Sequence, residues 1–255
     1  MHFSLIQPRP GHEREAAFER NREGAYEDHQ WLWQRFFPAP PGTPRDYMFR
    51  RLDAGVAGRF YVVSARTPRT DVPGWEVKTK RYEPAVSAGQ QFQFELRANP
   101  VVSRRGDALL NADGSTKLRP TGKPKYKVVR HDVVMDAKKR LLAERGLASW
   151  GDWQDNDKPV LHDLTHRACA KWLHDIGREH GFEINRDQDK PDQDRLSVDA
   201  YTQHRGKGEK LRFSSVDFAG ELTVFDAVKF GIALTLGVGH AKAFGCGLLL
   251  VRPIG

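Results

Sequence analysis

The feature that most constrains the fold of this chain is the order in which strand-like and helix-like patterns follow one another. Apolar and polar residues alternate in Asp46–Leu52 and Arg59–Ala65, which predicts two strands that pair across the glycine-containing turn at Asp53–Gly58. Three further elements are predicted around this hairpin: a strand at His2–Ile6, a helix at Arg22–Phe37 with Asn21 as its N-cap, and a strand at Trp75–Tyr82. The first third of the chain is therefore expected to run strand, helix, strand, strand.

The remainder of the chain repeats this order around long insertions. After a linker at Glu83–Gly89, the residues of Gln91–Ala98 alternate as in a half-buried strand. The later elements are expected to be helices at Ala137–Arg145 and Thr165–His180, a hairpin of Asp199–His204 with Glu209–Asp217, and a strand, a helix and a strand at Gly220–Val224, Phe225–Leu236 and Gly247–Val251. Two such units in tandem predict an α+β fold of two ferredoxin-like (RRM-like) domains, residues 1–88 and 89–255, with a helical insertion in the second.

Charge narrows the range of partners. Lys and Arg number 41 against 33 Asp and Glu, a formal charge of +8, and the pI is near 9.5. Such a balance favours a polyanionic partner, either nucleic acid or an anionic membrane surface, with solubility alone as the alternative. Two cysteines, Cys169 and Cys246, cannot make a disulfide framework. Because the apolar stretches are too short for a signal peptide or a membrane span, we expect a cytoplasmic protein without membrane contact.

A glycine-rich stretch, GVGHAKAFGCGLLLV, lies between the last predicted helix and the last predicted strand. Glycines allow a positive φ and let backbone N–H groups approach a phosphate, and a lysine within the stretch adds positive charge. The candidate phosphate-binding residues are Gly237, Gly239, Lys242, Gly245 and Gly247. The stretch is neither a Walker A loop nor a Rossmann loop. On composition alone, a tight turn without a ligand explains it equally well.

Three blocks resemble one known family. The segment YEDHQWLWQRFFP resembles the Tyr-x-x-His-Gln-x-Leu-Trp block of the CasE branch of CRISPR RNA-processing endoribonucleases, found in type I-E systems. FQFELRANP resembles the opening strand of that family's second domain, and the glycine-rich stretch resembles its C-terminal signature. The blocks span nearly the whole chain in the family's order.

The resemblance implies an activity. Members of this family cleave precursor CRISPR RNA at the base of the repeat stem-loop without a metal or cofactor. Attack by the 2′-OH beside the scissile phosphate yields a 2′,3′-cyclic phosphate and a 5′-OH. The enzyme then stays bound to the mature crRNA, with the other subunits of the Cascade complex as partners. A non-catalytic subunit that binds the repeat hairpin is the alternative, and a metal-dependent nuclease is a third reading.

By position, His29 matches the family's catalytic histidine and Tyr26 its neighbouring tyrosine. Their i, i+3 spacing places both on one face of a helix. An imidazole with an unperturbed pKa near 6.5 can accept or donate a proton at neutral pH, and the sequence leaves open whether His29 is the acid, the base or both. His29 also falls on an apolar arc of the predicted helix, so a core histidine hydrogen-bonded to Tyr26 or to a carbonyl is the alternative. For Tyr26 the alternative is packing.

Basic residues are expected to grip the RNA. In the family, a hairpin enters the groove of the RNA stem, and the equivalent residues here are Arg205, Lys207, Lys210 and Arg212. A second basic run, in a segment where the family varies, includes Lys117, Arg119, Lys123, Lys125 and Lys127. An exposed hairpin and a solvated loop are the respective alternatives. The segments Val101–Arg130 and Asn185–Arg195 are longer than the family pattern suggests.

The sequence does not favour a metal site. His162 and His166 have the helical i, i+4 spacing that zinc sites use, with Asp163, Cys169 and His174 nearby. No glutamate follows His162 and no Cys-x-x-Cys pair occurs. We therefore expect no metal, and the histidines are more simply explained as part of a solvated helix. No aromatic RNP motif is found either, so base stacking on a sheet face is not predicted.

Overall fold

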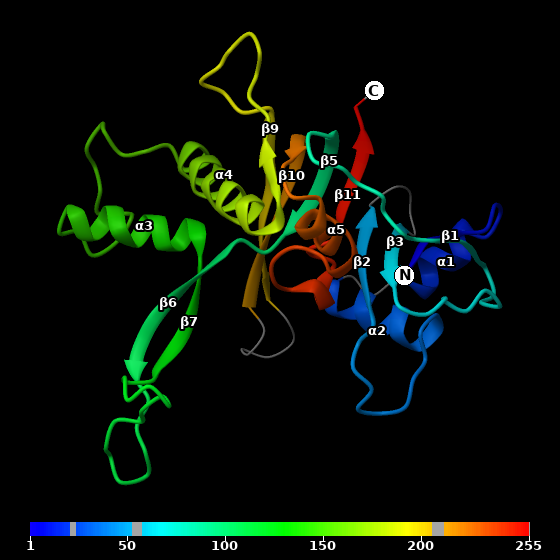
Figure 1. The fold of residues 1–255 in the computed structure, drawn as a ribbon, viewed down its shortest axis with the longest axis horizontal. Helices are drawn as coiled ribbons and strands as arrows, with labels where there is room; N and C mark the ends of the chain where they lie inside the picture. The colour runs from blue at the N-terminus through cyan, green and yellow to red at the C-terminus, as the bar shows by residue number, and fades with distance from the viewer. Residues whose placement is uncertain (21–23, 53–57, 206–211, 255) are drawn as a thin grey trace. The chain divides into compact units, whose positions relative to one another are not determined.

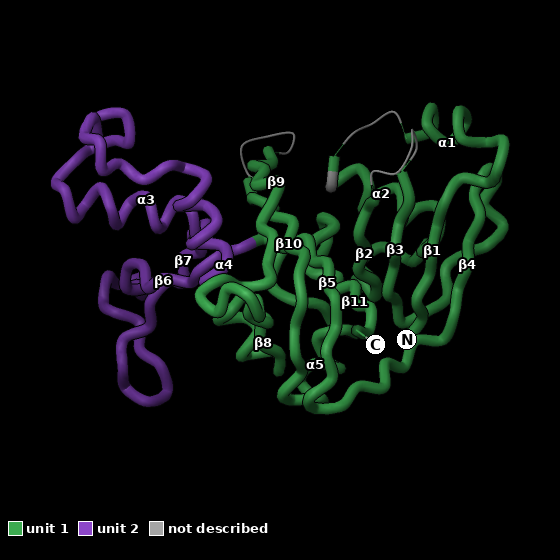
Figure 2. The backbone as a smooth tube through the Cα atoms, turned by 90° about the horizontal axis from the view of Figure 1, so that it is seen from above, with its two compact units in different colours: residues 1–99, 173–255 green, residues 100–172 purple. Residues whose placement is uncertain are grey.

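The computed structural model describes residues 1–20, 24–52, 58–205 and 212–254. The chain divides into two compact units, the larger formed by residues 1–99 with 173–255 and the smaller by residues 100–172 (Figure 2). Within the described residues, no helix combines the length and the apolar composition needed to cross a membrane.

The N-terminal sheet of the larger unit is antiparallel, with the strand order β2-β3-β1-β4 (Figure 1). Its strands are β1 (His2–Pro8), β2 (Tyr47–Leu52), β3 (Arg59–Ser64) and β4 (Trp75–Arg81). The predicted hairpin is confirmed, since Tyr47 pairs with Ser64 and Leu52 with Arg59. Two helices, α1 (Glu13–Glu19) and α2 (Ala25–Arg35), connect β1 to β2.

The helix predictions need correction in this region. The short helix α1 was not predicted. Helix α2 begins at Ala25 rather than Arg22, because Gly24, a poor helix former, stands at its N-cap. The predicted N-cap, Asn21, lies outside the described residues.

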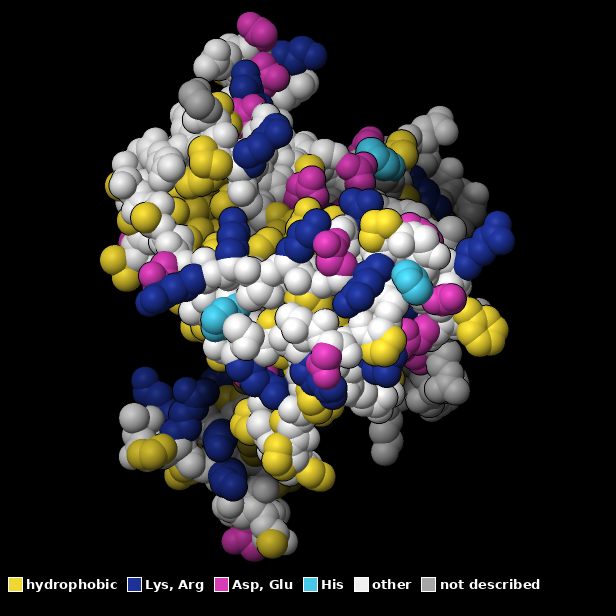
Figure 3. Space-filling model, turned by 90° about the vertical axis from the view of Figure 1, so that its right-hand side faces the viewer, with side chains coloured by type: hydrophobic (Ala, Val, Ile, Leu, Met, Phe, Trp, Pro, Cys, Tyr) yellow, Lys and Arg dark blue, Asp and Glu magenta, His cyan; other side chains and the backbone are white. Residues whose placement is uncertain are grey.

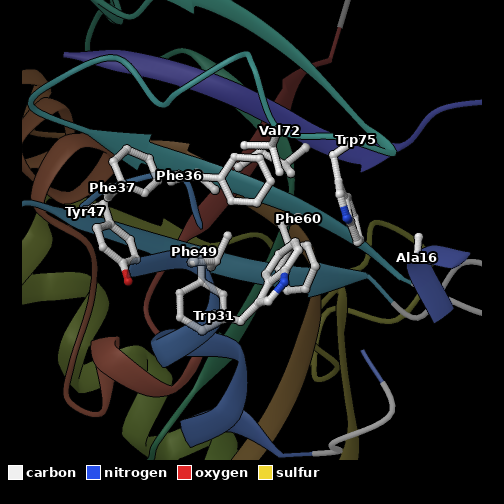
Figure 4. Close-up of a cluster of buried hydrophobic side chains, with 12 residues drawn as sticks. Ala16, Trp31, Phe36, Phe37, Tyr47, Phe49, Phe60, Val72 and Trp75 are labelled. Atoms are coloured by element: carbon white, nitrogen blue, oxygen red, sulfur yellow. The ribbon is translucent and has the colours of Figure 1, made fainter. Parts of the chain in front are cut away.

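Aromatic side chains fill the space between α2 and this sheet (Figure 4). Trp31 of α2 lies 4.6 Å from Trp75 of β4 and 5.3 Å from Phe60 of β3, measured between ring centroids. Arg20 pairs with Asp28, and its guanidinium lies 4.9 Å from the centre of the Trp31 ring. This packing fixes the orientation of α2, so that one face of the helix is held in the core and the opposite face is presented outward.

The C-terminal sheet is also antiparallel, with the strand order β11-β5-β10-β8 and with β9 paired to β10. Its strands are β5 (Gln91–Ala98), β8 (Phe182–Ile184), β9 (Leu196–Arg205), β10 (Arg212–Val224) and β11 (Leu249–Pro253). The helical elements are α4 (Leu161–His180), α5 (Ala227–Leu236) and the 3₁₀ turn η1 (Lys242–Phe244). β5 has the predicted bounds. Two predicted strands, Glu209–Asp217 and Gly220–Val224, are one long strand, and β8 was not predicted.

Within the larger unit, side chains from the two sheets meet at a small apolar junction. Met48 and Val63 of the N-terminal sheet are buried against Leu248, which precedes β11. Beside them, the guanidinium of Arg50 on β2 lies 3.5 Å from the Glu95 carboxylate on β5. The junction thus joins β2 and β3 of the N-terminal sheet to the segment before β11, and Arg50 adds a contact with β5.

The smaller unit contains a hairpin that the sequence did not reveal. Strands β6 (Val101–Ala108) and β7 (Tyr126–Asp132) pair antiparallel, in the segment interpreted as a basic insertion. Helix α3 (Val133–Glu144) begins four residues before its predicted start at Ala137. The reason is Asp132, whose carboxylate accepts hydrogen bonds from the backbone N–H groups of Val134 and Met135 and so caps the helix.

Candidate active site

His29 lies half-buried on α2, where the hydroxyl of Tyr47 contacts two of its atoms. The Tyr47 oxygen lies 3.0 Å from His29 Nδ1 and 2.9 Å from the His29 carbonyl oxygen. A carbonyl can only accept, so the single proton of Tyr47 is donated to it, and the contact with Nδ1 requires Nδ1–H as the donor. Burial raises the pKa of Tyr47, which keeps that proton in place. The neutral ring therefore carries its proton on Nδ1 and leaves Nε2 as a free base.

The surroundings of His29 favour the neutral imidazole. Burial lowers its pKa below the ordinary 6.5, and the positive charge of Arg45 lowers it further. The ring stacks on Tyr47 at 5.7 Å and lies 6.3 Å from Trp33. Figure 4 shows the Tyr47 ring at the edge of the aromatic cluster, with its oxygen directed away from the packed rings. His29 thus borders the core without being enclosed in it.

Tyr26 makes a different set of contacts. Its side chain is 45% exposed, and its hydroxyl oxygen accepts a hydrogen bond of 2.7 Å from Gln30 Nε2. Because this bond uses a lone pair of the oxygen, the hydroxyl proton remains available to donate to another group. The partner of His29 is thus Tyr47, and the expected alternative of a His29–Tyr26 hydrogen bond is not what the structure shows.

The glycine-rich stretch packs directly on the strand that carries Tyr47. A Cβ atom added to Gly237, whose φ is 75°, would lie 2.6 Å from the sulfur of Met48, and one on Gly245 would lie 3.3 Å from the Phe49 ring. At Gly247, with φ 87°, a Cβ atom would lie 2.6 Å from the Val238 carbonyl oxygen. These three glycines are buried and are required for close packing.

The other two candidates of the glycine-rich stretch differ from these three. Gly239, with φ 70°, is half-buried. The Nζ atom of Lys242 donates to the carbonyl oxygens of Leu236 and Gly237, at 2.7 and 2.9 Å. It therefore caps the C-terminus of α5, where a cation is favoured by unpaired carbonyls and by the helix dipole.

A row of rings connects the β9–β10 hairpin to α2. The His204 ring stacks on Phe213 at 4.5 Å, and Phe213 stacks on Phe244 of η1 at 5.1 Å. Phe244 in turn lies 6.5 Å from Tyr26. The sequence analysis did not identify this row, because its members come from three distant segments.

The structure places the basic candidates at exposed positions where it describes them. Arg205 and Arg212 face each other as the terminal pair of β9 and β10, and both are exposed. Lys207 and Lys210 lie outside the described residues. Figure 3 shows Lys and Arg side chains interspersed with acidic ones over most of one face, and gathered with fewer acids near the bottom of the view.

The basic candidates Lys117, Arg119 and Lys123 are exposed and lie in the turn region between β6 and β7. Residues 101–131 hold eight Lys or Arg and only two Asp. We define residues 101–131 as the basic arm of the smaller unit. Its strands are exposed or half-buried throughout, so the basic arm presents its charge to solvent.

The histidines weighed as metal ligands are dispersed. His162 lies 3.5 Å from Asp163, whereas His174 lies 2.7 Å from Asp194 in the predicted loop 185–195. Cys169 and Cys246 are both buried and unbonded to each other. Among the residues that the structure describes, no three His, Cys, Asp or Glu side chains converge to hold a metal ion.

Sequence reasoning missed two residues of this site, Tyr47 and Arg45. Arg45 precedes the predicted strand Asp46–Leu52 and Tyr47 lies within it, and only the alternation of that strand could be recognised from the sequence. Their proximity to His29 arises from the packing of α2 on β2, which no local pattern encodes. The available sequence signal was a tyrosine within this strand and an arginine just before it, because the strand is covered by an apolar helix.

Known proteins resemble the chain along nearly its full length. It is 26% identical to the CRISPR system Cascade subunit CasE of Escherichia coli, over 90% of this chain and 92% of the relative. It is 28% identical to the CRISPR-associated endoribonuclease Cse3 of Thermus thermophilus, over 68% of this chain and 61% of the relative.

Among solved structures, the chain resembles that of Thermus thermophilus Cse3 bound to an RNA representing a pre-cleavage complex. The TM-score is 0.59 at 22% identity, and the match covers 99% of this chain and 98% of the other. At this identity the likeness shows the fold. A family model described as CRISPR associated protein matches residues 1–253, which confirms the resemblance found in the sequence: the chain belongs to the CRISPR-associated protein family.

Proposed function

We propose that this protein is a metal-independent endoribonuclease that cleaves CRISPR precursor RNA at the base of the repeat stem-loop and stays bound to the mature crRNA as a Cascade subunit. The name of the E. coli relative, a Cascade subunit, and that of the Thermus relative, an endoribonuclease, support the proposal. The chain spans 92% of the former. The geometry around His29 supplies the chemical argument.

The strand orders support a description as two ferredoxin-like domains, with a boundary near residues 88 and 89. In each sheet, four strands taken in chain order lie fourth, first, third and second, as β4-β1-β3-β2 and as β11-β5-β10-β8. Antiparallel pairing and a helix after the first strand of each set complete the resemblance to the split βαβ arrangement. The smaller unit, residues 100–172, interrupts the second set after β5 and includes the first part of α4.

The proposed reaction uses the ribose as its nucleophile. His29 Nε2 accepts the proton of the 2′-OH, the 2′ oxygen attacks phosphorus, and the bond from phosphorus to the 5′ oxygen breaks. The Tyr26 hydroxyl, whose proton is available because its oxygen accepts from Gln30, donates to the departing 5′ oxygen. The products are a 2′,3′-cyclic phosphate and a 5′-OH.

One observation carries this proposal: a neutral His29 ring whose Nδ1–H is held by Tyr47. A base needs an unprotonated nitrogen at neutral pH, and both the lowered pKa and the bound Nδ1–H provide it. Proton transfer of this kind accelerates reactions by roughly 10²–10⁴.

We assign RNA binding to residues other than His29 and Tyr26. Arg205 and Arg212 of the hairpin, with the sequence candidates Lys207 and Lys210, are proposed to contact the phosphates of the stem. The glycine-rich stretch contributes by supporting β2 and through the backbone near Gly239. Lys117, Arg119 and Lys123 of the basic arm add electrostatic attraction.

The experiment is a cleavage assay of the host's repeat RNA with the protein in excess EDTA. We expect cleavage to persist in the chelator and to stop when the ribose before the cut carries a 2′-deoxy substitution. Cleavage that disappears in EDTA would indicate a metal-dependent nuclease. Tight binding without cleavage would indicate the non-catalytic repeat-binding subunit.

A further inference from the structure

Arg45, in the segment that leads into β2, has no partner for part of its buried guanidinium. Within the described residues, its Nη1 atom is inaccessible to solvent and makes no hydrogen bond. Asp46, the next residue, is paired with Arg66 at 2.7 Å instead. A buried cationic nitrogen without a compensating group is energetically costly, so its retention calls for an explanation.

The absence of a carboxylate partner distinguishes Arg45 from the other described arginines with buried nitrogens. In the described part of the chain, five arginines have a buried side-chain nitrogen without a hydrogen bond. Four of them lie within 4 Å of a carboxylate, as the ion pairs Arg20–Asp28, Arg35–Glu19, Arg50–Glu95 and Arg51–Asp28. Arg45 alone among the five has no such ion pair.

The neighbours of Arg45 are the groups already assigned to the active site. It lies two residues before Tyr47, whose hydroxyl holds His29. The charge of Arg45 lowers the pKa of His29 and that of Lys242, in each case as the second cause after burial. Three groups that can carry positive charge thus approach one another, from α2, from the segment before β2 and from η1.

The chemistry of the three groups distinguishes Arg45 from Lys242. Lys242 already donates to two carbonyl oxygens at the end of α5. Arg45 retains an unused donor on a planar fork that matches the oxygens of a phosphodiester. Arg45 as a whole is half-buried, so an anion that reaches its guanidinium would offset the repulsion between Arg45 and Lys242.

We propose that Arg45 is a catalytic residue that binds a non-bridging oxygen of the scissile phosphodiester beside His29. This inference rests on the proposed function. As the 2′ oxygen attacks, negative charge grows on the non-bridging oxygens, and a preorganised guanidinium stabilises it. Arg45 gains and loses no proton in the step, since His29 takes the 2′-OH proton and the departing 5′ oxygen receives one.

The test compares Arg45→Met and Arg45→Lys with the wild-type protein in single-turnover cleavage of repeat RNA at saturating protein. Loss of one preorganised donor to a developing oxyanion costs about 10²–10³ in rate, so we expect that loss for Arg45→Met and a smaller loss for Arg45→Lys. Arg69→Met is the matched control, since Arg69 is an exposed arginine paired with Asp71. Its rate should equal that of the wild type.

Two further readouts separate catalysis from folding and from binding. RNA affinity should change by no more than a few-fold in Arg45→Met. The acid limb of its pH–rate profile should move to higher pH, because removal of a positive charge raises the pKa of His29. Unchanged rates in both variants, or a rate loss matched by lost affinity with an unmoved acid limb, would overturn the inference. If the wild-type protein itself does not cleave the RNA, the proposed function is contradicted, and not only the role of Arg45.

Discussion

The two sheets of the larger unit have the same strand order and are built for different tasks. In the N-terminal sheet, an aromatic core packs against α2, and His29 lies at the border of that core. The smaller unit interrupts the C-terminal sheet after β5, and the β9–β10 hairpin of that sheet extends as a ribbon. The difference agrees with the proposed roles, because a proton-transfer group requires tight packing, whereas contact with a long polyanion favours extensions.

The largest effect on stability is expected within the glycine-rich stretch, which must fold tightly on itself at Gly247 and Val238 before it can pack on β2 and join the two sheets. Gly247→Ala should lower the free energy of unfolding by about 3 kcal/mol, since it adds a steric clash to an unfavourable positive φ. Gly89→Ala is the control, because Gly89 has φ 84° with no atom near its Cβ position. It should lose only about 1 kcal/mol. Equal losses in urea denaturation would show that close packing on Val238 is unimportant.

Tyr47→Phe tests whether the rigidity of the N-terminal sheet serves the chemistry. The variant removes the hydroxyl that fixes the His29 tautomer, and we expect about a tenfold lower cleavage rate with a stability loss of about 1 kcal/mol. Tyr61→Phe on β3 is the control. A single-turnover rate unchanged in Tyr47→Phe would mean that the tautomer is set by something else.

This site also shows what a sequence can and cannot reveal. His29 and Tyr26 were predicted from the sequence because a helical arc and a family block mark them. Tyr47 could not be assigned a role, since it lies 18 residues from His29 and reaches it only through tertiary packing. Most strands were predicted from alternation. The β6–β7 hairpin was missed because its strands bury neither face and so lack the apolar period, and β8 was missed because it has only three residues.

The pH dependence of cleavage separates a base from a merely structural histidine. Burial and Arg45 hold the pKa of His29 below 6.5, so the folded protein keeps the neutral ring until the pH falls through that lowered value. The stability contribution of the neutral ring is likewise present above pH 6.5 and lost on acidification through the same range. We expect the single-turnover rate to be flat near pH 7 and half-maximal below pH 6.5. A half-maximal rate above pH 6.5 would contradict the assignment.

The smallest effects are expected on the extensions, where each contact is exposed. Arg205→Ala should weaken binding of the repeat hairpin a few-fold and reduce the slope of log K against log salt by about 0.7–0.9, the value for one phosphate contact. The cleavage rate on saturated RNA should not change. Arg69→Ala serves as the control for loss of one positive charge. If the Arg205→Ala variant retains the full salt slope, Arg205 does not contact phosphate.

The most direct test of the whole account is single-turnover cleavage by His29→Ala, measured with the affinity for the repeat hairpin and the unfolding temperature. His12→Ala, an exposed histidine paired with Glu15, is the matched control. The account predicts a loss of at least about a hundredfold in rate for His29→Ala, with affinity and folding retained. Cleavage within a few-fold of the wild-type rate, or a variant that fails to fold, would contradict the claim that this ring transfers the proton.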